Sequence, residues 1–319
     1  MPENKFFNKI LVPVDGSPFS VVAQELAASI SKQFGSQVTV MHVISHELMN
    51  PAMQDLTLGG ADVGIPSAGI TRGDFTIPTQ LPRQPSASAP KKMINEITSI
   101  YRERGEHILK NAVAFFKDEG ISADEELVED NDPAKTISKE ADLESYDLIV
   151  IGRSSGDPLL EEKKAHLGRL ASKVARHAKI PVLIAASKRR LSRMLVPVDG
   201  SQASKRAAEH SGIMASKSGA KVTLLYVQES SLFRMRPTLS EEIGRKVLSS
   251  VADQFKNVEL EQRLESGHPG KIITHIADVD DYDIIVMGSH GHGGAKQMLL
   301  GSVTDHVLHY ADQAVLIVK

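Results

Sequence analysis

The sequence predicts an α/β protein made of two tandem, doubly wound domains, each with a five-stranded parallel sheet. The first observation behind this prediction is an internal repeat. Residues 10–15 read ILVPVD, and residues 194–199, which lie 184 positions later, read MLVPVD. The repeat continues at the same offset, since residues 38–43 read VTVMHV and residues 222–227 read VTLLYV. A repeat of this length indicates two copies of one structural unit.

The second and third observations are the alternation of short apolar runs with amphipathic segments and the continuous hydrophobicity of those runs. Both are typical of a parallel sheet that helices cover on both faces, with ligands bound at the carboxyl ends of the strands. Strands are expected at residues 9–14, 37–43, 125–129, 147–151, 181–185, 193–198, 221–227, 258–264, 283–287 and 314–318. Helices are expected at residues 18–34, 92–118, 133–143, 165–178, 202–218, 239–255, 270–278 and 302–310.

The repeat also suggests the domain boundaries, and 319 residues are enough for two domains. The first domain, called the first half, is expected over residues 1–187, and the second half over residues 191–319. Between them, residues 187–190 read SKRR. This short run is typical of a solvated connector, although its positive charges also fit a contact with nucleic acid or phosphate.

The first half contains an insertion. Val43 and Gly152 are 109 positions apart, whereas their counterparts Val227 and Gly288 are 61 positions apart, an excess of 48. The excess falls at about residues 45–91, which are rich in Gly, Pro, Ser, Ala and Thr and have little periodicity. This composition predicts a long surface loop, and a lid or a partner-binding segment is the alternative.

Composition excludes several classes of protein. With 41% hydrophobic and 24% charged residues, the chain has the composition of a soluble globular protein. It has no cysteine, which excludes disulfides, thiolate metal sites and a catalytic cysteine. A formal net charge of −3 gives no reason to expect nucleic acid as a partner. Because we find no signal-peptide core and no membrane-spanning run, we expect a cytoplasmic protein without a membrane partner.

The stretch most informative about function is residues 283–303, DIIVMGSHGHGGAKQMLLGSV. An apolar strand ends at Gly288, a glycine-rich loop follows, and Ser302 is the expected N-cap of a helix. Glycines let backbone N–H groups approach an anion, and a helix N-terminus adds further donors and a positive dipole end. The stretch therefore predicts an anion cradle. A glycine-rich connection without a ligand is the alternative.

The spacing of this stretch resembles the ATP-binding signature of the universal stress protein family, G-2x-G-9x-G-(S/T). Gly288, Gly291, Gly301 and Ser302 match that signature position by position. The resemblance covers both halves apart from the insertion. It implies the doubly wound fold and an ATP or other adenine-nucleotide cofactor, with Mg²⁺ or Mn²⁺ held, if present, through the phosphates.

The resemblance also implies which residues bind the nucleotide. Asp199 matches an acidic position near the nucleoside, although a helix cap is an alternative role for an aspartate before Gly-Ser. Val227 matches a position whose backbone contacts adenine. The predicted cofactor-binding set is Pro197, Asp199, Val227, Gly288, His290, Gly291, Gly301, Ser302 and Val303.

The corresponding loop of the first half departs from the signature. Gly152 is retained, but Ser155 replaces the second glycine, Arg169 replaces the serine, and the segment up to Gly168 is three residues longer. A non-glycine residue at the close-approach position restricts the backbone. We therefore expect one competent site, in the second half. Arg153 and Arg169 could still hold an anion in another geometry.

No metal site and no catalytic residue are predicted. His290 and His292 lie two apart without a third ligand, and His306 and His309 lie three apart on an expected helix. No nucleophile–base motif surrounds Ser302. The leading hypothesis is therefore a stress-response or signalling protein that acts by binding an adenine nucleotide. A slow ATP hydrolase and a nucleotide-free scaffold are the rivals.

The fifth strand of each half predicts how the halves pack. Residues 181–185 and 314–318 are apolar and carry no charge, so as edge strands they would recruit another strand. The resemblance implies dimerisation through this strand. We expect an antiparallel pair within the chain, related by a pseudo-two-fold axis. Pairing between two chains, which would make a homodimer, is the alternative, and the sequence does not indicate which protein partner the chain has.

Overall fold

The computed structural model describes residues 6–45, 91–154, 167–186, 190–229, 237–291 and 300–319. Most of the insertion expected at residues 45–91 lies outside these described residues. No helix in the described part of the chain is long and apolar enough to cross a membrane.

Ten strands in the described residues form one continuous sheet, in the order β3-β2-β1-β4-β5-β10-β9-β6-β7-β8. The strands are β1 (Lys9–Pro13), β2 (Gln37–Ile44), β3 (Ala123–Glu129), β4 (Leu148–Gly152), β5 (Val182–Ala185), β6 (Arg193–Pro197), β7 (Lys221–Glu229), β8 (Leu260–Gly267), β9 (Ile284–Gly288) and β10 (Ala314–Val318). Within each half the five strands are parallel and follow the same order, which confirms the predicted doubly wound fold. The strand order reverses between β1 and β4 in the first half and between β6 and β9 in the second half.

The helices alternate with the strands, as expected from the sequence. They are α1 (Pro18–Phe34), α3 (Lys91–Asp118), α4 (Pro133–Leu143), α5 (Arg169–His177), α6 (Gln202–Ser218), α8 (Pro237–Ala252), α9 (Pro269–Val279) and α10 (Ser302–Tyr310), with a short 3₁₀ helix at Asp253–Phe255. The equivalent helices α1 and α6 have equivalent ends. Ser17 and Ser201 cap their N-termini, and Gly35 and Gly219 end them in the left-handed conformation that glycine tolerates best.

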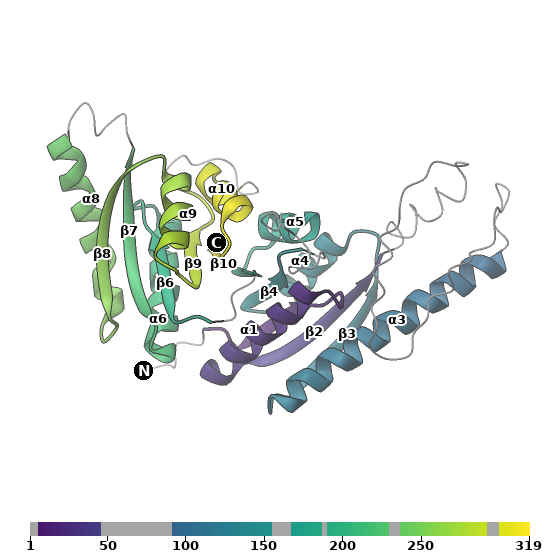
Figure 1. Ribbon diagram of the computed structural model, residues 1–319. Helices are drawn as coiled ribbons and strands as arrows, with labels where there is room; N and C mark the ends of the chain where they lie inside the picture. The colour runs from purple at the N-terminus through teal and green to yellow at the C-terminus, as the bar shows by residue number, and fades with distance from the viewer. Residues whose placement is uncertain (1–5, 46–90, 155–166, 187–189, 230–236, 292–299) are drawn as a thin grey trace, which may run out of the picture.

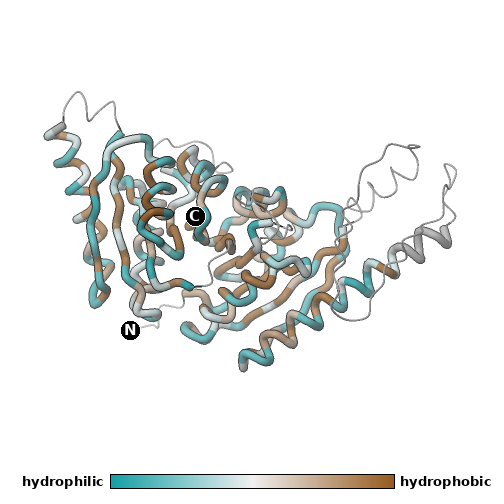
Figure 2. Tube along the Cα trace, in the orientation of Figure 1, coloured by the Kyte–Doolittle hydropathy of each residue, from teal (hydrophilic) through white to brown (hydrophobic). Residues whose placement is uncertain are grey.

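Two hydrophobic cores lie on the two faces of the sheet, and each contains residues of both halves. The inner strands are largely brown in Figure 2 because most of their side chains are apolar on both faces, whereas the edge strands β3 and β8 are more polar. Helices α1, α3, α6 and α8 supply one core, whereas α4, α5, α9 and α10 supply the other (Figure 1). The hydrophobic cores therefore continue from one half into the other.

The halves join through β5 and β10, the one antiparallel pair among the described strands. Leu183 pairs with Leu316, Val182 with Ile317 and Ile184 with Val315, so the pairing is symmetric about its centre. This confirms the predicted pseudo-dimer within one chain. Figure 1 shows the consequence: α5 and α10 come together above the junction of the two lobes.

Candidate functional site

The candidate site lies at the carboxyl ends of β6 and β9, where the strand order of the second half reverses. Asp199 follows β6, Gly288 is the last residue of β9, and Gly291 lies in the loop that follows. In doubly wound sheets this switch point is the usual place for a ligand, because the two connections leave toward opposite faces. The fold thus brings together two stretches of sequence that are about ninety residues apart.

The loop after β6 is shaped by hydrogen bonds from its own side chains. Asp199 Oδ1 accepts from the Ser201 N–H at 2.9 Å, and Ser201 Oγ accepts from the Ser204 N–H at 3.2 Å. Gly200 between them has a φ of 88°, which favours glycine. Ser201, and not Asp199, is therefore the N-cap of α6. The Asp199 carboxylate instead stands at the turn that precedes the helix.

The glycines of the signature have different structural roles. A β-carbon on Gly288 would lie 2.6 Å from the backbone carbon of Ala203, so this glycine lets β9 pack against α6. A β-carbon on Gly291 would lie 2.6 Å from Asp199 Oδ2. The second glycine thus brings the loop backbone next to the Asp199 carboxylate. A side chain at position 291 would therefore have to displace the Asp199 carboxylate from its place at the switch point.

The N-terminal end of helix α10 is hydrogen-bonded to the end of β9 and the loop that follows it. The Gly301 N–H donates to the Ser289 carbonyl at 2.8 Å, and Thr304 Oγ1 donates to the Gly288 carbonyl at 2.9 Å. Gly301 is the N-cap and has no side chain to satisfy the first turn, so the prediction that Ser302 is the N-cap is wrong. Ser302 is instead the exposed first residue of the helix. A helix start without a capping side chain leaves N–H groups for an external acceptor.

His290 lies between the two loops. Its carbonyl oxygen accepts from Ser201 Oγ at 3.4 Å, and its Nδ1 is 2.9 Å from Ser289 Oγ. Its Nε2 is buried and has no hydrogen-bond partner among the described residues. A buried polar atom of this kind normally has a partner, so Nε2 is suited to a polar ligand group.

The remaining predicted residues lie around the same edge of the sheet. Pro197 is the buried last residue of β6, and the next residue, Val198, donates its N–H to the Leu225 carbonyl of β7 at 2.9 Å. Val227 of β7 and Val303 of α10 are partly buried against the same hydrophobic core. The structure therefore places all nine predicted residues at the carboxyl edge of the second half.

The first half repeats the framework of this site. Asp15 Oδ1 accepts from the Ser17 N–H at 2.9 Å, and a β-carbon on Gly152 would lie 2.8 Å from the backbone carbon of Phe19. The glycine that ends the fourth strand is thus required for helix packing in both halves. This requirement explains why Gly152 is present in a loop that lacks the second glycine and the serine of the signature.

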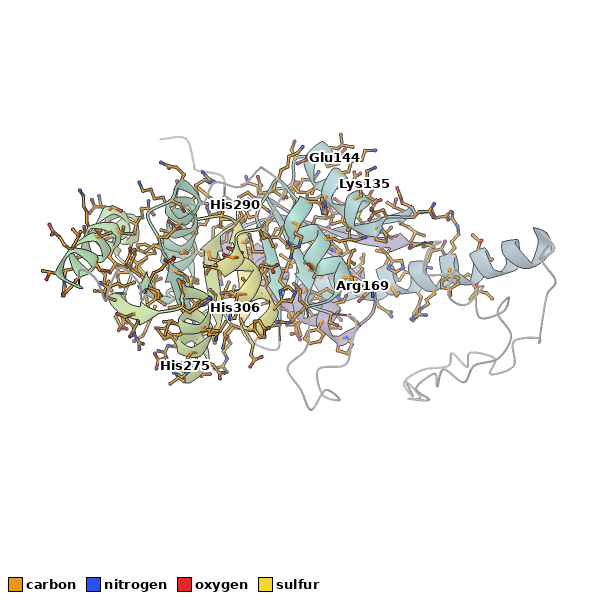
Figure 3. The ribbon with its side chains drawn as sticks, turned by 90° about the horizontal axis from the view of Figure 1, so that it is seen from above. Lys135, Glu144, Arg169, His275, His290 and His306 are labelled. Carbon is orange, nitrogen blue, oxygen red and sulfur yellow. The ribbon has the colours of Figure 1, made fainter. Side chains whose placement is uncertain are left out.

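The two arginines proposed as an alternative anion site in the first half have different environments. The side chain of Arg153 is buried, and its guanidinium donates to carbonyl oxygens at the C-terminal end of α10, those of Leu308, His309 and Ala311. An anion-binding role for Arg153 is therefore wrong, because its donors face helix carbonyls. Arg169 is the exposed first residue of α5 (Figure 3), and Ser155 lies outside the described residues.

The histidines do not assemble a metal site in the described part of the chain, where no group of three candidate ligands occurs. His306 lies against His268 and Tyr310, with ring centroids 5.7 and 4.5 Å away. Burial, followed by the charges of His268 and Lys271, lowers the pKa of His306. His309 Nδ1 is 2.7 Å from the Asp305 carbonyl of its own helix, and His292 lies outside the described residues.

Three contributors to the site were not foreseen from the sequence. Ser201 supplies the cap and the contact to His290, Thr304 ties α10 to β9, and Arg153 holds the far end of α10. The role of Ser201 could have been predicted from the sequence, because Asp-Gly-Ser before a helix offers two candidate N-cap residues. The roles of Thr304 and Arg153 could not have been predicted, because each donates to a backbone carbonyl that only the fold brings near.

The fold and the site define a class of doubly wound α/β proteins that present a glycine loop and a helix N-terminus at the switch point. The chain belongs to the universal stress protein family, whose model matches residues 6–61, 74–186 and 191–319. The repeated match makes it a tandem member of the family.

Individual relatives agree with this assignment. Universal stress protein MJ0531 of Methanocaldococcus jannaschii is 32% identical over 138 residues, covering 40% of this chain and 81% of the relative. Universal stress protein Mb2028c of Mycobacterium bovis is 26% identical over 257 residues, covering 73% of this chain and 83% of the relative. A solved universal stress protein from Archaeoglobus fulgidus covers 98% of both chains with a TM-score of 0.64 and 22% identity, which supports the fold.

Proposed function

We propose that this protein binds ATP or another adenine nucleotide at one site in the second half and acts by binding, in stress response or signalling. The site comprises Pro197, Asp199, Val227, Gly288, His290, Gly291, Gly301, Ser302 and Val303. The two domains are residues 1–187 and 191–319. In this proposal the nucleotide biases the conformation or the partner choice of the protein, and catalysis is not required.

The observation that carries the proposal is the approach of Gly291 to Asp199 beside the N-terminus of α10. Backbone N–H groups of the loop and of the first helical turn would hold phosphate oxygens. The Asp199 carboxylate would accept hydrogen bonds from ribose hydroxyls or the adenine amino group. The nucleotide therefore fits the donors and acceptors that the site offers, with a divalent cation held through its phosphates.

The experiment that tests the proposal is identification of the ligand that co-purifies with the protein. Mass spectrometry of the supernatant after denaturation should detect an adenine nucleotide at close to one per chain. Protein freed of that ligand should regain it in an ATP titration. A chain that releases no nucleotide and has no measurable affinity for ATP would instead be a scaffold.

The rival enzymatic function has one observation in its favour, the contact between Ser289 Oγ and His290 Nδ1. A hydroxyl beside an imidazole is the elementary arrangement of an activated nucleophile. Ser289 is, however, buried and follows β9 directly, where its N–H donates to the Val318 carbonyl. Phosphate release by the wild-type protein well above that of Gly291→Val would favour slow ATP hydrolysis.

A further inference from the structure

Helix α10 is held at its C-terminal end by a side chain from the other half of the protein. Arg153, which follows β4 of the first half, is 3% exposed. Its Nη2 lies 2.8 Å from the Leu308 carbonyl oxygen and 3.2 Å from that of His309, and its Nη1 donates to Ala311. The last carbonyls of a helix lack intrahelical donors, and a cation there also opposes the negative end of the helix dipole. The guanidinium therefore satisfies and fixes this end of α10.

A second arginine of the first half acts near the other end of α10. Arg176 of α5 forms an ion pair with Asp305, one turn into α10. The Asp305 N–H donates to the Gly301 carbonyl at 2.8 Å, so Asp305 lies in the first turn of the helix whose start belongs to the candidate site. Figure 3 shows α5 and α10 side by side at the centre of the molecule. Arg176 offsets a negative charge that would otherwise repel a phosphate group.

Arg153 and Arg176 both belong to the first half, and both contact α10, the helix whose N-terminus is part of the candidate site in the second half. The first turn of α10 is tied to the glycine loop through Thr304 and Gly301, so a shift of the helix would displace the loop as well. A short helix moves as one rigid element. Its placement by the first half therefore decides where its N-terminal N–H groups point.

We infer that Arg153, after β4, and Arg176, in α5, are positioning residues for the nucleotide site of the second half. The inference rests on the proposed function. Arg153 sets the position of α10, and Arg176 neutralises Asp305 beside the phosphate groups. The first half thus contributes to nucleotide affinity without binding a nucleotide itself.

Calorimetric titration with ATP, on full-length variants well below their unfolding temperatures, tests the role of Arg153. Arg153→Ala should weaken binding roughly two- to thirtyfold, the range for residues that couple to a site through packed elements. Arg153→Lys, which keeps the charge but loses the fork of donors, should be intermediate. Leu109→Ala is the matched control, because Leu109 is a buried residue of α3 on the opposite face of the sheet. It should lower stability but leave ATP affinity unchanged.

Variants that change the charge at Arg176 or Asp305 test the role of Arg176. The direction of the change in ATP affinity distinguishes an effect on the site from a general loss of stability. Arg176→Gln should weaken ATP binding, because Asp305 then keeps its negative charge without its arginine partner, with only His309 Nδ1 at 3.9 Å beside it. Asp305→Asn alone should bind ATP as tightly as the wild type or more tightly, although it removes a stabilising carboxylate from a helix N-terminus. The double variant should regain the lost affinity. Equal losses of affinity in all three variants would overturn the inference for Arg176.

The outcomes separate this inference from the proposed function. Wild-type protein that binds ATP, together with an Arg153→Ala variant of equal affinity, would overturn the positioning role and leave the proposed site intact. A loss in Leu109→Ala equal to that in Arg153→Ala would also overturn it, since stability alone would explain the result. Wild-type protein that does not bind ATP would overturn both.

Discussion

Gly291 and Asp199 face each other across the switch point of the second half, so closely that a β-carbon on Gly291 would lie 2.6 Å from Asp199 Oδ2. The two residues belong to different connections, one after β9 and one after β6. Because Asp199 Oδ1 accepts from the Ser201 N–H, the turn that carries this carboxylate is itself fixed. Loop backbone, carboxylate and helix N-terminus are thereby held at one edge of the sheet.

This relationship predicts a specific role for the charge of Asp199. Asp199→Asn keeps an oxygen that can accept from the Ser201 N–H, so the variant should fold with a near-normal melting temperature. Its binding free energy for ATP should weaken by about 1.5–3 kcal/mol, the value of a hydrogen bond to a charged group. Asp15→Asn is the matched control, because Asp15 makes the same turn in the first half. An equal loss of affinity in both variants would assign the effect to turn stability.

The first glycine of the signature should behave as a packing residue in both halves. Gly152→Ala and Gly288→Ala would each force a β-carbon to within 3 Å of the backbone of the neighbouring helix. Each should lower the free energy of unfolding by about 1–3 kcal/mol, as overpacking does. Urea denaturation of the two variants checks this. Destabilisation by the Gly288 variant alone would show that the two positions are not structurally equivalent.

The antiparallel pair between β5 and β10 should be open to cross-linking within one chain. Leu183 and Leu316 are direct cross-strand partners, and the chain contains no cysteine. Oxidation of a double variant with cysteine at both positions should give a monomeric disulfide in dilute protein, since neighbouring strands hold opposite β-carbons about 5 Å apart. Non-reducing gels and mass spectrometry distinguish this product from a linked dimer. Covalent dimers at low protein concentration would mean that β5 and β10 pair between chains.

Lys319 should make stability depend on pH in the alkaline range. Its Nζ donates to the Ala175 carbonyl at the end of α5, and burial lowers its pKa from 10.5 to about 8. Between pH 8 and 10.5 the unfolded chain therefore binds more protons than the folded chain. The free energy of unfolding should rise with pH there, at up to about 1.4 kcal/mol per pH unit. In Lys319→Met this rise should be smaller, and identical pH profiles would contradict the prediction.

Much of the fold could be predicted because each element carries a local signal. The repeat of ILVPVD and MLVPVD set the tandem arrangement, and the boundaries of α1, α6 and β10 agree with the expected ones. The uncharged apolar strands at residues 181–185 and 314–318 also indicated how the halves join. Boundaries were less accurate for β3 and β8, in which no residue is fully buried and no continuous apolar run occurs.

The site was predictable where backbone conformation or close approach dictates a residue type, as at Gly291 and Asp199. It was not predictable where a side chain bonds to a backbone carbonyl far away in sequence. Arg153 illustrates this limit, because its sequence neighbourhood suggested an anion ligand, whereas its guanidinium reaches helix carbonyls 155 to 158 residues away. The same limit applies to Thr304, whose partner is the Gly288 carbonyl.

Calorimetric titration of the full-length wild-type protein and of Gly291→Val with ATP tests the central claim most directly. The wild type should bind about one ATP per chain. Gly291→Val should lose binding, because its side chain would occupy the space next to Asp199 and exclude two or three charge-assisted hydrogen bonds, worth on the order of 3–6 kcal/mol. Gly120→Ala, at a left-handed position in the first half with open space around it, is the control for a loss of stability away from the site. Two equivalent sites per chain, or unchanged affinity in Gly291→Val, would contradict a single nucleotide site built on this glycine.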